Sequence, residues 1–244
     1  MNLLQLRDLS RKKMGETTAA FWTDAEVNTF INEACRNIAH YTKCLRSNAY
    51  ITTSDCTENT TSAGSNEIAL TTIDPLIDAP YEVYFHDEGE RWIKLDLATR
   101  SELDQEYPGW RDAVGRTYTD QSTGDITYNK DSIVSQPMFY YFDTEENMFG
   151  WYPPTDEDQT TTNNIHVYFT KRHTTISADT DSPTIPEQLH LCVTDFVCAM
   201  AFETRGIIDR SNDYWRKAHE RMLMYITERG REREDEEIIM RPGR

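Results

Sequence analysis

Apolar residues recur every three to four positions near the start of the chain, which indicates two amphipathic helices. The first should span residues 3–14, with Gly15 as its stop signal. Thr23 and Glu26 form a capping box, so we expect the second helix to begin there. Its apolar positions continue to about Arg46.

Helical periodicity returns in the last quarter of the sequence. Residues 189–202, just after Pro186, are apolar on nearly all sides, which is typical of a buried central helix. A final helix should run from about Asp209 to Arg229. Neither pair of helices can bury its apolar face alone, so we predict that they pack as one bundle. The predicted bundle core comprises Trp22, Val27, Phe30, Ile31, Ile38, Leu189, Val193, Phe196, Val197, Met200, Trp215 and Met222.

The middle of the chain has the apolar runs and turn residues of β-strands, with a short helix expected at residues 99–107. The predicted fold class is therefore α+β. Residues 1–48 and 184–230 would form the helical bundle, and residues 49–183 a β-rich insertion. The predicted strands cover residues 67–70, 82–86, 91–97, 138–142, 148–152 and 165–171.

The last segment, residues 231–244, is expected to be an extended C-terminal arm. Residues 231–237 are almost entirely charged and cannot bury enough apolar surface to fold alone. The triplet Ile238, Ile239 and Met240 follows, and it could extend a partner's sheet edge or fill apolar pockets. The alternative is that the last helix simply runs on to the end of the chain.

Composition narrows the possible partners. The chain has 25 Lys and Arg against 42 Asp and Glu, a net charge of −17, which opposes sequence-independent binding of DNA. The charge does not exclude contact with DNA that slides past the protein, because an acidic channel wall would repel the DNA backbone and keep it from adhering. No apolar run approaches the roughly 20 residues that a membrane helix needs, and the start does not resemble a signal peptide. We expect a protein made in a cytoplasm, with no membrane partner.

Candidate chemistry is sparse. The five cysteines include no C-x-x-C pair, which argues against a disulfide framework and a cysteine-based zinc site. The spacing of His40 and Cys44 could suit two metal ligands, but no further ligands are identified. Asp195 lies inside the apolar helix and needs a hydrogen-bond or ion-pair partner there. No motif for a nucleophile elbow or a phosphate-binding loop is present, so we expect no enzyme activity, cofactor or metal.

An ordered set of motifs along nearly the whole chain resembles the head–tail connector adaptor proteins, or neck proteins, of tailed bacteriophages. These motifs lie at residues 3–8, 21–34, 102–110, 151–154 and 179–190. The resemblance implies a virion protein of the neck, assembled as a ring that is usually dodecameric. Its partners would be the portal protein above, a tail or nozzle protein below, and genomic DNA that passes through the lumen without sequence-specific binding.

In such families the bundle forms the ring body and the C-terminal arm reaches the portal. The resemblance therefore assigns portal binding to Glu237, Ile238, Ile239, Met240, Arg241 and Pro242. Two alternatives stay open. The chain could be another neck or tail-tube ring protein that does not contact the portal, or a phage enzyme with an unrecognised site.

Overall fold

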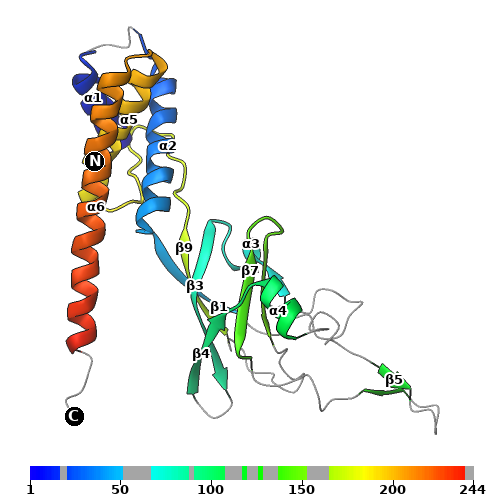
Figure 1. Ribbon diagram of the computed structural model, residues 1–244. Helices are drawn as coiled ribbons and strands as arrows, with labels where there is room; N and C mark the ends of the chain where they lie inside the picture. The colour runs from blue at the N-terminus through cyan, green and yellow to red at the C-terminus, as the bar shows by residue number, and fades with distance from the viewer. Residues whose placement is uncertain are drawn as a thin grey trace. The chain divides into compact units, whose positions relative to one another are not determined.

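The computed structural model describes residues 1–16, 21–51, 67–87, 91–107, 117–119, 126–128, 137–152 and 165–239. The chain divides into two compact units (Figure 1). The helical unit comprises residues 1–45 and 171–244, and the sheet unit comprises residues 46–170. Helices at both ends of the chain and a β-rich middle confirm the predicted α+β class.

Two helices from each end of the chain build the helical unit. They are α1 (Leu3–Met14), α2 (Asp24–Thr42), α5 (His190–Thr204) and α6 (Ile208–Ile239), with a short 3-10 turn, η3 (Glu187–Leu189), before α5. The capping box at Thr23 and Glu26 starts α2, as predicted. However, α2 ends at Thr42 rather than near Arg46, because Lys43 adopts a left-handed conformation at φ 48°.

The central helix α5 packs against α1, α2 and α6, which explains why it is apolar on nearly all sides. Nine of the twelve residues predicted for the bundle core are buried, and the other three are half-buried against that core. The buried ones are Trp22, Val27, Ile31, Ile38, Leu189, Val193, Phe196, Val197 and Met222, and the half-buried ones are Phe30, Met200 and Trp215.

An extended strap, residues 172–186, leads from the last strand back to α5. The side-chain amide of Asn32 donates to the carbonyl of Ile176 at 3.0 Å and accepts from its amide at 2.8 Å. The amide of Leu3 donates to the carbonyl of Asp181 at 2.8 Å. The strap is thus bonded to the middle of α2 and to the first turn of α1, where helix amides otherwise lack partners.

The sheet unit contains a seven-stranded sheet in the order β1-β9-β3-β4-β7-β8-β2. β4 and β7 pair in parallel, whereas the pairs β1–β9, β3–β4, β7–β8 and β2–β8 are antiparallel. The strands are β1 (Arg46–Ile51), β2 (Glu67–Ala69), β3 (Ile77–Asp87), β4 (Arg91–Leu97), β7 (Phe139–Asp143), β8 (Met148–Tyr152) and β9 (Ile165–Lys171). Shorter elements are α3 (Leu70–Ile73), α4 (Arg100–Glu106) and the pair β5 (Thr117–Thr119) and β6 (Ile126–Tyr128).

Successive side chains along each strand point to opposite faces of this sheet. In β9, Ile165, Val167 and Phe169 are fully buried in the sheet core. The intervening His166 stacks against Tyr50 of β1, with 4.1 Å between ring centroids. Two polar segments of the sequence, residues 53–67 and 156–164, fall outside the described residues, except for Glu67 in β2.

Candidate functional site

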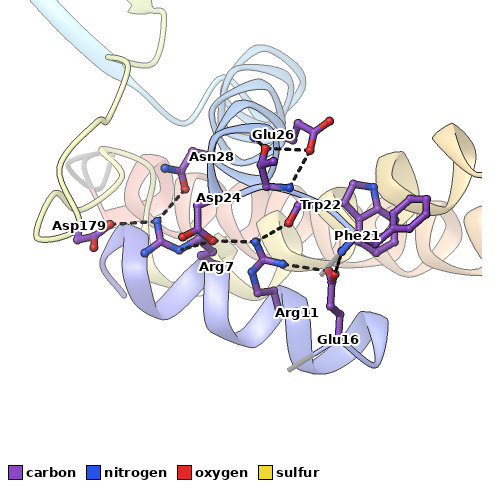
Figure 2. Close-up of polar contacts among 10 residues, drawn as sticks. Arg7, Arg11, Glu16, Phe21, Trp22, Asp24, Glu26, Asn28 and Asp179 are labelled. Atoms are coloured by element: carbon purple, nitrogen blue, oxygen red, sulfur yellow. Dashed lines mark hydrogen bonds and ion pairs between the residues drawn. The ribbon is translucent and has the colours of Figure 1, made fainter. Parts of the chain in front are cut away.

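The first polar cluster of the helical unit joins α1, α2 and the strap around two buried arginines (Figure 2). Nη2 of Arg11 donates to Oδ1 of Asp24 at 2.7 Å and to the carbonyl of Trp22 at 2.9 Å. Nη1 of Arg7 lies 3.1 Å from Oδ1 of Asp179, and its Nε lies 3.6 Å from Asp24. Both guanidinium groups are thus held by carboxylates of other elements, and the cluster fixes the bundle geometry.

Glu16 completes this cluster at the end of α1. Its Oε2 accepts from Nη1 of Arg11 at 3.0 Å, and its other carboxylate oxygen accepts from the amide of Phe21 (Figure 2). The contact ties the end of α1 to the residues just before α2. No sequence motif signals it, because the spacing of Arg11, Glu16 and Phe21 matches no recurrent capping or pairing pattern.

The second cluster surrounds Asp195, whose side chain is 3% exposed. Its Oδ1 accepts from Nζ of Lys13 at 2.6 Å, and its Oδ2 accepts from Nε of Arg221 at 2.8 Å. Thr194 supplies a further acceptor for Lys13 at 2.7 Å. The ion pair that the sequence requires at Asp195 is therefore present, and it binds α1, α5 and α6 together.

The cysteines of the helical unit are buried free thiols. Burial raises the pKa of Cys35, Cys192 and Cys198 to about 12, so all three are neutral near pH 7. Cys44 is buried as well, and burial raises the pKa of its thiol. His40, which the sequence places four residues earlier as a possible second metal ligand, is exposed. Within the described residues, no three His, Cys, Asp or Glu side chains gather into a metal-binding group.

Helix α6 packs on the bundle along a regular seam of buried and half-buried positions. These positions alternate at spacings of four and three residues: Ser211, Trp215, Ala218, Met222, Tyr225 and Arg229. Nη1 of Arg229 donates to the carbonyl oxygen of Cys44 at 3.5 Å. Among the α6 side chains that the structure describes, Arg229 is the last to reach the bundle.

The backbone of α6 continues as helix from Gly230 to Ile239, beyond the end of α2 (Figure 1). These ten residues (239 − 229) span about 15 Å at the helical rise. The expected extended arm is therefore helical as far as Ile239, which corrects the prediction for residues 231–239. Charge pairs four residues apart, Arg231 with Asp235 and Arg233 with Glu237, are the sequence signal that favours this helix.

The residues assigned to portal binding fall into two groups. Glu237, Ile238 and Ile239 lie in the last turn of α6. Met240, Arg241 and Pro242 lie outside the described residues. The backbone thus brings the first three to the far end of the helix, well away from the bundle core.

The clusters in the helical unit tie helices together, and the described thiols are neutral. The family described as SU10 adaptor protein matches residues 1–244. The chain belongs to the SU10 adaptor protein family. This confirms the resemblance to phage head–tail adaptors and makes the chain a structural, neck-type adaptor component of a bacteriophage virion. Proteins of this SU10 adaptor family are in general structural rather than enzymatic.

Two further findings bear on this SU10 adaptor. No curated protein matches the sequence. None of the helices in the described parts of the chain is long and apolar enough to cross a membrane. The assignment to the family is based on the match of the family model to residues 1–244.

Proposed function

We propose that this chain forms a homo-oligomeric ring, dodecameric as the family resemblance implies, that joins the portal to the tail. The observation that carries the proposal is the end of α6, which runs ten residues past its last described contact with the bundle. We infer that this continuation of α6, whose backbone extends beyond the end of α2, docks on another protein. The family match along the whole chain supports the adaptor role.

The far end of α6 is the proposed portal contact. Glu237, Ile238, Ile239, Met240, Arg241 and Pro242 combine an apolar centre with charged flanks. Each contact would be small, but a ring presents many copies at once, so the summed attachment is strong. The domain assignment follows from this role: residues 184–230 complete the ring body with residues 1–48, and residues 231–244 form the docking segment.

The insertion, residues 49–183, is the proposed contact with the tail or nozzle protein. The genome would pass through the lumen without sequence-specific binding, because a net charge of −17 leaves few cations for phosphate contacts. We assign no catalytic residue or cofactor. Asp195, the buried acid of the apolar helix, is paired with Lys13 and Arg221, which gives it a structural role.

Mixing the full chain with portal protein tests this function. The wild-type chain should co-sediment with portal as a closed ring, whereas a chain that ends at Glu236 should keep its fold and lose docking. Leu97→Asp serves as a control, because Leu97 is exposed on the sheet unit, and this variant should dock like wild type. Unchanged docking by the truncated chain would overturn the portal contact. Rings that ignore portal would instead indicate the neck or tail-tube alternative.

A further inference from the structure

Helices α2 and α6 run in the same direction on either side of α5 (Figure 1). Contacts at both ends set their relative height. Near the start, the guanidinium of Arg205, in the turn between α5 and α6, lies 3.9 Å from the ring centroid of Trp22, just before α2. Near the end, Arg229 of α6 reaches the carbonyl of Cys44, just after α2. The two intervals, 22 residues (44 − 22) and 24 residues (229 − 205), are nearly equal. Positions whose numbers differ by roughly 185 therefore lie at the same height along the bundle, to within about one turn.

Opposite charges occupy equal heights on the outward faces of these helices. On α2, Glu33 precedes Arg36, and both are exposed. On α6, Lys217 precedes Glu220, and both are exposed as well. Glu33 thus matches the height of Lys217, and Arg36 matches the height of Glu220. The order of charges on α6 is the reverse of that on α2.

An apolar site follows these charges on each helix. Leu223 and Met224 of α6 are each 63% exposed, as is Tyr41 of α2. Tyr41 lies within about one turn of the height of these two residues. Leu223 and Met224 are adjacent, so they expose apolar surface at one place on α6, which is the kind of surface that protein contacts bury.

We propose that the outward face of α6 in one copy packs against the outward face of α2 in the next copy. The proposal rests on the proposed ring and names the surfaces that close it. Rotation about a ring axis leaves height along that axis unchanged, so groups at equal height meet when the helices run along the axis. The pairs Glu33–Lys217 and Arg36–Glu220 then face each other, and Tyr41 covers Leu223 and Met224. Because the two faces differ, the contact is head-to-tail and propagates around a ring.

Charge reversal and its repair test the pairing. Glu33→Lys alone and Lys217→Glu alone should each reduce ring formation roughly ten-fold, because each brings like charges together. The double variant Glu33→Lys/Lys217→Glu should restore assembly. Glu106→Lys on α4 of the sheet unit makes the same charge change at an exposed position and should assemble normally. Ring formation is measured by mass photometry of the full chain with portal protein, and folding by circular dichroism.

A second variant tests the apolar site formed by Leu223 and Met224. Leu223→Asp/Met224→Asp should remain folded, since both side chains are exposed, and should lose the ring. Assembly of this variant at the wild-type level would overturn the proposal, as would a charge-swapped double variant no better than its parents. If wild-type chains form no ring even with portal, both the ring and its interface fail. If wild-type rings form and the variants match them, only the interface fails.

Discussion

At the scale of single residues, the helical unit is held by charges that it has removed from water. Arg11 and Asp195 are almost fully buried, and both are bonded to opposite charges on other helices. Sequence alone indicates that Asp195 needs a partner, since an isolated acid is costly in an apolar helix. It cannot indicate Lys13 or Arg221, because only the packing of α1 and α6 on α5 brings them there.

Loss of Arg11 should be costly. Arg11→Ala removes the guanidinium that donates to the carbonyl of Trp22 and to the carboxylate of Glu16 in a largely buried site. We expect the free energy of unfolding to fall by about 3 kcal/mol. Arg216→Ala removes an exposed pair with Asp213 and should cause no measurable change. Urea unfolding followed by circular dichroism measures both, and equal stability of the two variants would contradict the assignment.

His173 should make stability depend on pH. Burial, together with the nearby charge of Arg36, lowers the pKa of His173 to about 4, from an ordinary value of 6.5. Between these values the unfolded chain binds more protons at this residue than the folded chain. Stability is therefore complete above pH 6.5 and is lost as the pH falls toward 4, by on the order of 2 kcal/mol.

The variant His173→Gln tests this dependence. Its urea midpoint should change less than that of wild type between pH 6.5 and pH 4, whatever its absolute stability. His190, whose pKa burial also lowers, is unchanged in both proteins and cancels in the comparison. Parallel pH profiles for the two proteins would show that His173 is not protonated on unfolding.

At the scale of elements, local signals located the helix starts and missed what depends on distant pairing. The capping box at Thr23 predicts α2, and the structure has a second capping box at Thr99 that starts α4; in both, the partner lies three residues away. Residues 46–51 carry no local strand signal, because β1 forms only through its hydrogen bonds to β9, more than a hundred residues later. The lack of apolar residues at 231–237 predicts an extended end, whereas opposite charges spaced four residues apart favour the helix that is present.

Gly230 offers a test of the projecting end of α6. It lies where the seam against the bundle ends, and a Cβ there would meet no heavy atom within 4 Å. Gly230→Ala should therefore stabilise the helix locally by about 0.5–1 kcal/mol. Hydrogen exchange of the amides of residues 231–239 should become slower. Unaltered exchange would indicate that this segment is not helical in solution.

Gly206 provides the matched control for that substitution. Its φ of +71° lies in the left-handed region, where a side chain is strained even though a Cβ would meet no atom within 4 Å. Gly206→Ala should therefore destabilise the turn between α5 and α6, by about 1 kcal/mol. The same substitution is thus expected to raise stability at Gly230 and to lower it at Gly206, and the difference comes from backbone conformation.

At the scale of the whole molecule, the negative net charge allows DNA to pass the protein but opposes its binding. The chain has 42 acidic residues against 25 basic ones, and several of the basic ones already form ion pairs within the chain. Arg7, Arg11 and Arg221 are paired within the helical unit, as is Lys13. The cations left for phosphate contacts are therefore fewer than composition suggests, and each lost contact weakens sequence-independent affinity for DNA.

Assembled rings should accordingly not retain duplex DNA at roughly 150 mM salt, the ionic strength at which the Debye length is about 8 Å. A filter-binding or gel-shift titration with random-sequence duplex measures this, with a basic DNA-binding protein as positive control. Acidic surfaces repel the backbone at short range, so lowering the salt should not rescue binding. Retention that grows as salt is lowered would instead reveal a basic surface facing the lumen, and would mean that assembly turns the acidic faces of the subunit away from the DNA.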